Sequence, residues 1–182
     1  MPDEKERELV SQLSEGDDRA FHSLISIYLE KSFGIALRLM GNEFDAREMV
    51  QEASIKAYKN LQRFDYNNLF GPWFIRILIN TCINQLKKRK VRRFFSISDS
   101  EESDSKEWFS EVTSDENPGE EHLRQEQSEQ IQKALKKIPE KQRTALVLYD
   151  LEGYSQQEVA QILECPVGSV MSRIYYGRKK LK

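Results

Sequence analysis

Hydroxyl, guanidinium, phenol and ammonium groups recur at helical spacing near the C-terminus of the chain. With an advance of about 100° per residue, one arc of a helix roughly 100° wide holds Ser169, Ser172, Arg173, Tyr176 and Lys180. Such groups donate hydrogen bonds to base edges and phosphates when a helix enters the major groove of DNA. The pattern predicts DNA binding, and a polar face that water merely solvates is the alternative.

The elements that must position this arc are two short helices with a sharp bend between them, over Tyr154–Lys182. Ser155 followed by Glu158 is typical of a capping box, and Pro166 suits the first turn of the second helix. The face opposite the arc is apolar and can pack on the first helix: Val167, Val170, Met171, Ile174 and Leu181. Five basic residues and no acidic residue follow from Arg173 onward. Together these features predict a helix-turn-helix.

Length and composition limit the alternatives. A chain of 182 residues with 38% hydrophobic content is enough for one or two small domains. The longest apolar stretch, Trp73–Ile79, is interrupted by Arg76 and is far shorter than the roughly 20 residues of a membrane span. Met1–Glu8 contains aspartate and glutamate from the third residue onward and does not resemble a signal peptide, so we expect a cytoplasmic protein without membrane insertion.

Neither a metal centre nor a cofactor site is expected. Cys82 and Cys165 lie far apart without neighbouring ligand residues, which predicts ordinary thiols. His22 and His122 are isolated, so no cluster for metal binding or proton transfer is indicated and no catalytic residue is predicted.

Charge is divided unevenly along the chain, although the net charge is only -2. Asp99–Glu121 contains ten carboxylates and one basic residue, which leaves 27 basic and 20 acidic residues elsewhere, a balance of +7. The stretch around it, 94–121, is also rich in serine and is therefore predicted to be a linker. Just before it, Lys87–Arg93 has six basic residues in seven, a density that favours phosphate binding over a solvated face.

The two flanking regions, 1–93 and 122–182, are predicted to be all-α domains, because apolar residues recur at intervals of three and four and no alternating strand pattern competes. The expected helices are Glu4–Leu13, Asp17–Met40, Asp45–Phe64, Gly71–Arg93, Glu121–Ile138 and Pro139–Tyr149, followed by the helix-turn-helix. Turns are expected at Gly16, Gly41, Asp65–Asn68 and Gly153.

Two segments of the first domain carry possible function. Asp45, Glu48 and Glu52 are predicted to form an exposed acidic stripe that could meet a basic protein surface, although a solvated face is the simpler interpretation. Trp73 and Phe74 could stack on unpaired bases, but core packing is the favoured role for both.

These segments, in this order around an acidic linker, resemble a bacterial sigma factor of the extracytoplasmic-function (ECF) type, which retains only the second and fourth conserved regions. The resemblance is carried by Asp45–Tyr58, by Gly71–Asn84, and by the helix-turn-helix with its Pro166–Val170 and Ser172-Arg173 segments.

The resemblance implies two sets of promoter contacts and a set of polymerase contacts. The minus-35 element would be contacted by Ser169, Ser172, Arg173, Tyr176 and Lys180. The minus-10 element would be contacted by Asp65, Asn67 and Phe70 of a base-capturing loop and by Arg76, Asn80, Asn84, Lys87 and Lys88 of the following helix. The clamp helices of the largest polymerase subunit would be bound by Asp45, Glu48, Gln51 and Glu52.

The resemblance also implies partners and a role for the linker. Core RNA polymerase, including its flap, promoter DNA and an anti-sigma factor that is often membrane-bound are the expected partners. The linker would run through the polymerase towards the active-site and RNA-exit channels.

Some positions depart from the family pattern. Glu164 stands where glycine often ends the first helix of the hairpin, so the turn is expected either to adopt another conformation or to accept local strain. Met171, Tyr175 and Tyr176 replace commonly basic residues or histidine, and Asn84 lies where aspartate is frequent.

Two other classes share parts of this pattern. A conventional helix-turn-helix regulator would bind its operator without core polymerase, but it should carry a ligand-binding or dimerisation domain in place of the Asp45–Arg93 segments. A nucleic-acid enzyme would require the clustered carboxylates or histidines that the sequence does not provide.

Overall fold

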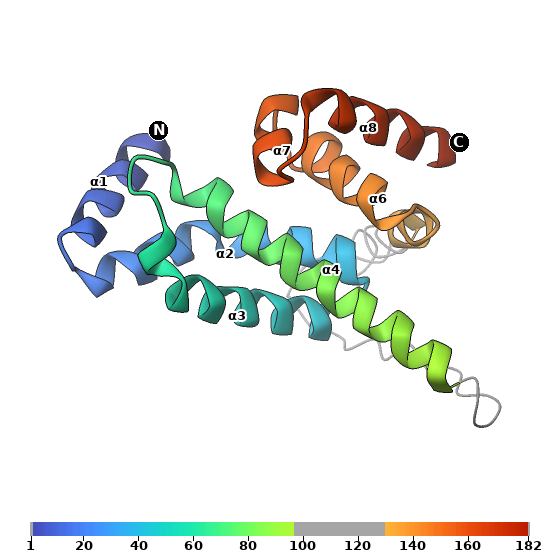
Figure 1. Cartoon of the computed structure of the whole chain (residues 1–182), viewed down its shortest axis with the longest axis horizontal. Coiled ribbons are helices and arrows are strands. Elements are labelled where there is room, and N and C mark those ends of the chain that lie inside the picture. Colours follow the sequence, from blue (N-terminus) through green and yellow to red (C-terminus); the bar gives the residue numbers. More distant parts are fainter. Residues whose placement is uncertain (1, 97–129, 182) are drawn as a thin grey trace, which may run out of the picture.

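A computed structural model describes residues 2–96 and 130–181, and within these two stretches every regular element is helical. The all-α prediction is confirmed. The two stretches form an N-terminal bundle (2–96) and a C-terminal bundle (130–181), shown in Figure 1. The expected acidic linker falls, beyond Ser96, outside the described residues.

The N-terminal bundle contains α1 (Pro2–Ser14), α2 (Asp18–Met40), α3 (Glu43–Lys59) and α4 (Phe70–Ser96). The side chain of Asp17 accepts a hydrogen bond from the amide of Arg19 and so caps α2 at its start. Gly41 ends α2 in the left-handed conformation (φ 85°), with its amide 2.8 Å from the carbonyl of Leu37. The turns expected at Gly16 and Gly41 are confirmed.

The single helix expected over Asp45–Phe64 is wrong at its end. α3 stops at Lys59, because the Asn60 side chain and backbone both donate to the carbonyl of Lys56, and a short 3₁₀ turn, η1 (Leu61–Arg63), follows. The asparagine competes with the next turn of α-helix by bonding the backbone itself.

The core of the N-terminal bundle lies between α2, α3 and α4. Leu24, Ile35, Met49, Phe70 and Phe74 are fully buried there, and Trp73 is half-buried against the same cluster. The interpretation of Trp73 and Phe74 as packing residues is confirmed.

A buried carboxylate anchors the start of α4. Glu6 is only 1% exposed, and it accepts hydrogen bonds from the Tyr28 hydroxyl (2.6 Å) and the Gly71 amide (2.8 Å). Gly71 must lack a side chain here, because a Cβ atom would lie 2.3 Å from the Tyr28 ring. The arrangement fixes where α4 leaves the preceding loop.

The C-terminal bundle begins, within the described residues, with a helical segment at 130–136. It continues through α6 (Glu140–Leu146), a π-helical turn η2 (Val147–Leu151), α7 (Gln156–Ile162) and α8 (Val167–Leu181). The helix expected through Tyr149 therefore changes its hydrogen-bonding pattern after Leu146. α8 packs closely on α6 because Gly177 leaves room for Leu146, whose Cδ1 would lie 2.4 Å from an added Cβ.

The C-terminal bundle packs against α2 and α4 of the N-terminal bundle, mainly through α7 and η2 (Figure 1). None of the helices in 2–96 and 130–181 combines the length and apolarity that a bilayer span requires.

Candidate nucleic-acid and polymerase interfaces

The helix-turn-helix forms as the sequence predicts. The Ser155 hydroxyl accepts from the amide of Glu158 (3.2 Å), and the Glu158 carboxylate accepts from the amide of Ser155 (2.7 Å), which completes a capping box at the start of α7. Hydrogen bonding from the backbone and hydroxyl of Ser155 lowers the pKa of Glu158. Pro166 directly precedes α8, and its carbonyl accepts the first amide bonds of that helix from Ser169 and Val170.

Of the two outcomes expected for the turn between α7 and α8, another conformation or local strain, the structure shows local strain at Glu164. Among the described residues, Glu164 is the one non-glycine residue with positive φ (47°). Left-handed backbone costs a residue with a Cβ atom about 1 kcal/mol or more. The Glu164 carboxylate reaches the Nη1 atom of Arg76 on α4 at 2.5 Å, so this turn touches the N-terminal bundle.

The predicted minus-35 face of α8 divides into an open and a covered part. Ser172, Tyr176 and Lys180 are exposed, whereas Ser169 and Arg173 are half-buried. The Arg173 guanidinium donates to the sulfur of Cys165 at 3.4 Å, which holds the side chain near the turn. Three of the five predicted contacts are therefore accessible to solvent.

The apolar face of α8 is narrower than the sequence predicts. Val170, Ile174 and Gly177 are buried, but Met171 is 53% and Leu181 45% exposed. The contact with α6 covers only one stripe of the helix, so these two predicted packing positions are corrected.

The predicted minus-10 groups lie along α4 in two environments. Asn80, Asn84, Lys87 and Lys88 are exposed. Arg76 is half-buried and paired with Glu164. Between α3 and α4 there is a hollow of about 300 Å³, with Asn84, Lys87 and Lys88 in one wall and Glu52 and Lys56 in the other.

Sequence reasoning missed the residues that complete this hollow. Lys56 donates to the Thr81 hydroxyl (3.3 Å) and pairs with Glu52 (2.6 Å), which ties α3 to α4 at its base. The four-residue interval between Glu52 and Lys56 could have predicted their ion pair, since residues at this spacing face each other on a helix.

The loop that precedes α4 exposes only two of the three residues predicted to contact the minus-10 element. Asp65 accepts from the backbone and side chain of Asn67 and from the side chain of Asn68, and these bonds lower its pKa. Both Asp65 and Asn67 are exposed at the loop tip. Phe70, in contrast, is fully buried among Phe21, Phe64 and Phe74 and offers no surface to a base. Its sequence-based assignment as a DNA contact does not fit this packing.

The predicted polymerase-binding stripe on α3 keeps three of its four members at the surface. Glu48 and Gln51 are exposed and Glu52 is half-buried beside Lys56. The expectation that Asp45 is exposed is wrong, because it is 6% exposed and turned towards α4.

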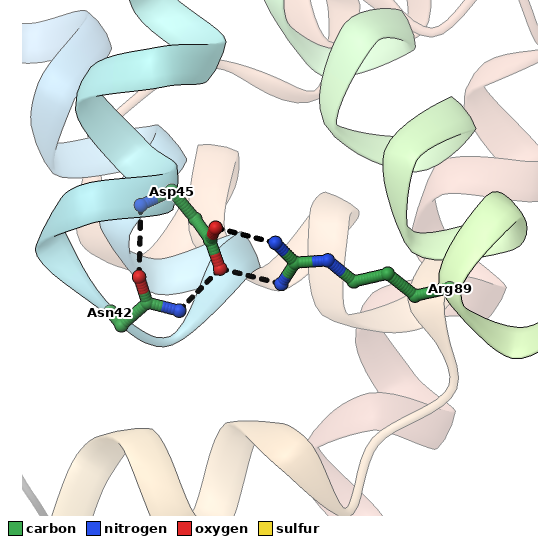
Figure 2. A network of polar contacts seen from close by, with 3 residues as sticks. All are labelled: Asn42, Asp45 and Arg89. Carbon is green, nitrogen blue, oxygen red and sulfur yellow. Dashed lines mark hydrogen bonds and ion pairs between the residues drawn. The ribbon is translucent and has the colours of Figure 1, made fainter. Parts of the chain in front are cut away.

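Asp45 is held by a polar network that joins α3 to α4 (Figure 2). The Arg89 guanidinium donates to both carboxylate oxygens, Asn42 donates to one of them, and the Asp45 amide donates back to the Asn42 side chain. The hydrogen bond from Arg89 is the main cause of the lowered pKa of Asp45, and the same bond raises the pKa of Arg89. One member of the basic run Lys87–Arg93 therefore binds a carboxylate of its own bundle.

Among residues 2–96 and 130–181 there is no group of three or more histidine, cysteine or acidic side chains arranged to hold a metal ion.

A helix-turn-helix bundle beside a bundle with a long basic helix is typical of a DNA-binding protein. Two family descriptions match it: Sigma-70 region 2 at residues 24–92 and Sigma-70, region 4 at residues 128–181. The chain belongs to the sigma-70 family, in its ECF group.

Similar proteins span nearly the whole chain. It is 34% identical to the RNA polymerase sigma-H factor of Pseudomonas aeruginosa over 181 residues, which is 100% of this chain and 94% of that protein. It is 33% identical to the ECF RNA polymerase sigma factor SigW of Bacillus subtilis (95% and 92% covered) and 34% identical to the ECF RNA polymerase sigma-E factor of Escherichia coli strain K12 (95% and 90%).

Two solved structures share the fold. CnrH in complex with the cytosolic domain of CnrY gives a TM-score of 0.68 at 25% identity, over 97% of this chain and 94% of that one. The sigma factor RpoE in complex with the anti-sigma factor NepR from Bartonella quintana gives 0.66 at 24% identity, over 88% and 93%.

Proposed function

We propose that this sigma factor binds core RNA polymerase, directs it to promoters with a minus-35 and a minus-10 element, and promotes opening of the DNA. The observation that carries the proposal is the presence of two exposed polar helix faces, on α4 and α8, in two helical bundles formed by separate stretches of the chain, 2–96 and 130–181. The domains would be 1–93 and 122–182, with 94–121 as the linker.

α8 is the proposed reader of the minus-35 element. Its exposed hydroxyl, phenol and ammonium groups at Ser172, Tyr176 and Lys180 lie on the side away from α6. Arg173 begins the same face and, once released from the turn, would offer a bidentate guanidinium to a guanine.

α4 is the proposed partner of the minus-10 element. The amides of Asn80 and Asn84 can bond base edges, and Lys87 and Lys88 can neutralise phosphates of the same strand. Asp65 and Asn67 at the neighbouring loop tip would contact an extruded base. Unstacking a base costs a few kcal/mol, and contacts of this kind repay it without nucleotide hydrolysis.

α3 is the proposed polymerase-binding helix. Glu48, Gln51 and Glu52 would meet the clamp helices of the largest subunit, and the C-terminal bundle would meet the flap. Asp45 would act through Arg89, by fixing α3 relative to α4, and would not touch the polymerase itself.

Regulation and location follow from the same surfaces. Because the similar CnrH and RpoE structures are complexes with CnrY and with the anti-sigma factor NepR, we propose an anti-sigma partner for this chain. We further propose that it acts in the cytoplasm, as an initiation factor with no cofactor and no catalytic reaction of its own.

In vitro transcription with core polymerase on a promoter library tests the proposal. The wild type should initiate at a defined set of promoters only when core polymerase is present. Arg173→Ala should lower initiation about tenfold or more, because losing a bidentate base contact costs about 1–3 kcal/mol.

Arg178→Ala is the matched control. It removes the same group from the same helix, but from a side chain that pairs with Asp150 within the bundle. Initiation by this variant should stay within about twofold of wild type, because surface ion pairs contribute little. Absence of initiation on every template would overturn the proposal, and operator binding without core polymerase would support a conventional regulator.

A further inference from the structure

The last turns of α4 carry an exposed apolar cluster, the aromatic tip, formed by Val91, Phe94 and Phe95. These side chains are 55%, 79% and 72% exposed, and the two phenyl rings meet edge to face with 6.2 Å between their centres. In Figure 1 this end of α4 extends beyond α2 and α3. Isolated apolar side chains are common on any protein surface, whereas adjoining ones mark an interaction site. The proposed function has so far given the aromatic tip no role.

The aromatic tip lies on the same face of α4 as the proposed minus-10 contacts. With an advance of about 100° per residue, an arc of about 120° holds four of those contacts and then the three residues of the tip. All seven side chains are exposed: Asn80, Asn84, Lys87, Lys88, Val91, Phe94 and Phe95. Arg89 lies on the opposite side of the helix, where it binds Asp45. One side of α4 therefore serves its own bundle, and the other forms a continuous exposed face over residues 80–95.

Cations adjoin the aromatic tip. Lys87 and Lys88 precede it by about one turn, Arg92 follows Val91, and all three are exposed. The cations can neutralise phosphates, while a phenyl ring can stack on an unpaired base or insert between two bases. Cations and aromatic faces on one surface are typical of a site for a nucleic-acid strand. The charge therefore favours DNA over an apolar protein groove as the occupant of this face.

The length of α4 determines how far the aromatic tip reaches along that strand. Phe94 lies ten residues after Asn84, which is about 15 Å at 1.5 Å per residue. This distance corresponds to about four or five bases at 3.4 Å each. The loop that carries Asp65 and Asn67 precedes the other end of α4. The tip would thus lie beside the minus-10 element, on the flank away from the base that this loop would hold.

We propose that Phe94 and Phe95 bind promoter DNA by stacking on bases that flank the minus-10 element. The inference rests on the proposed function of α4 and extends its DNA site by about four or five nucleotides. The polar groups of α4 bond base edges and phosphates, and the two rings contact the faces of the neighbouring bases.

The lifetime of open promoter complexes tests the proposal. Core polymerase with the full chain would be assembled on promoters selected from the library and challenged with heparin. Phe94→Ala with Phe95→Ala should shorten the lifetime about tenfold or more, because each lost stack costs about fivefold or more. Phe44→Ala is the matched control, since Phe44 is 77% exposed but lies on α3, and it should stay within about twofold of wild type. Circular dichroism and a core-binding titration should show no change in any of these variants.

The shape of the replacement distinguishes base stacking from apolar packing. Phe94→Trp with Phe95→Trp keeps two flat aromatic faces and should keep the lifetime within about twofold of wild type. Phe94→Leu with Phe95→Leu keeps apolar bulk without a flat face and should behave like the double alanine variant. A double leucine variant with the wild-type lifetime would mean that the tip packs on an apolar protein surface, and stacking on DNA would be overturned.

Salt dependence separates the rings from the cations beside them. Lys87→Ala with Lys88→Ala removes two phosphate contacts, so the slope of log affinity for the promoter against log salt should become shallower by about 1.4–1.8. Phe94→Ala with Phe95→Ala should lower the affinity and leave the slope unchanged, because the rings carry no charge. A shallower slope in the double alanine variant would show that the rings only position the lysines, which contradicts direct stacking.

Photo-cross-linking locates the contact. With p-benzoylphenylalanine in place of Phe95, the promoter should be cross-linked on one flank of the minus-10 element, and the same group in place of Phe44 should give no cross-link to DNA. Cross-links from position 95 to polymerase alone would overturn the proposal. If the wild type showed no core-dependent initiation, the proposed function and this inference would both fall. Normal initiation together with a double alanine variant that matches the wild type would overturn this inference alone.

Discussion

The two bundles present their proposed DNA contacts in different ways. In the C-terminal bundle, three of the five groups on the proposed reading face of α8 are exposed, and within 2–96 and 130–181 none of the three bonds to another element. In the N-terminal bundle, chemically similar groups are committed to the fold: Arg89 clamps Asp45, Arg76 binds Glu164, and Phe70 fills the core.

The difference follows from the size of the element that carries the contacts. α8 is a short helix that packs on its neighbours through one stripe of its surface, and the side chains on the remaining surface are exposed. α4 has 27 residues, packs against two helices of its own bundle and also contacts α7, so its polar groups have structural partners within reach. The role of a polar residue on α4 can therefore be assigned only when the side chains that contact it are known.

The strongest test of this comparison is Phe70→Ala. A fully buried aromatic side chain of this kind should contribute about 3–5 kcal/mol to the free energy of unfolding, measured by guanidinium denaturation. Tyr66→Ala in the same loop removes a 39% exposed ring and should cost less than about 1 kcal/mol. If Phe70→Ala kept its stability and lost only promoter opening, the residue would belong to the DNA site.

The next effect is expected for Arg89→Ala. It leaves the buried Asp45 carboxylate without its main partner, so unfolding should be about 2–3 kcal/mol easier. This loss of unfolding free energy is smaller than for a fully buried ion pair, because the Arg89 side chain is 39% exposed and water screens the interaction. Lys88→Ala is the matched control on the neighbouring exposed residue and should cost less than about 0.5 kcal/mol. Equal losses in the two variants would mean that the pair between Arg89 and Asp45 contributes nothing to stability.

Sequence periodicity predicts the helices well in both bundles, because apolar residues at three- and four-residue intervals must share a face. The capping box at Ser155 and the turns at Gly41 and Gly153 were predictable for a similar reason, since local geometry decides them. The end of α3 was missed because Asn60 stops the helix through its own side chain, which periodicity does not register.

The site was less predictable than the fold wherever a contact joins distant residues. Asp45 and Arg89 are 44 positions apart, and Arg76 and Glu164 are 88 apart, so no spacing rule connects them. Each residue alone looked like a surface charge. The faces of α8, by contrast, are set by the periodicity of a single helix packed on α6 and α7, and the sequence predicted them apart from Met171 and Leu181.

The Asp45 network also predicts how the stability of the N-terminal bundle depends on pH. The pKa of Asp45 is lowered from its ordinary value of 3.8, chiefly by Arg89, so its stabilising contribution is present above that value and is lost as the pH falls through the lowered pKa. We expect the stability difference between wild type and Arg89→Ala to stay constant from pH 7 to about pH 5 and to shrink below pH 3.8. Denaturation at several pH values checks this, and a difference that grew on acidification would contradict the assignment.

The smallest expected change in stability comes from a comparison of two variants at Glu164, where the two bundles touch. It distinguishes the cost of backbone strain from the contribution of the ion pair with Arg76. Glu164→Gly and Glu164→Ala both remove the carboxylate that binds Arg76, so they should loosen the contact between the bundles equally. They differ in backbone, because the residue has a φ of 47° and only glycine accepts that conformation freely. Glu164→Gly should therefore unfold with a free energy about 1 kcal/mol higher than Glu164→Ala. Equal stabilities would mean that the turn relaxes when the pair with Arg76 is lost, in which case the pair itself imposes the left-handed conformation.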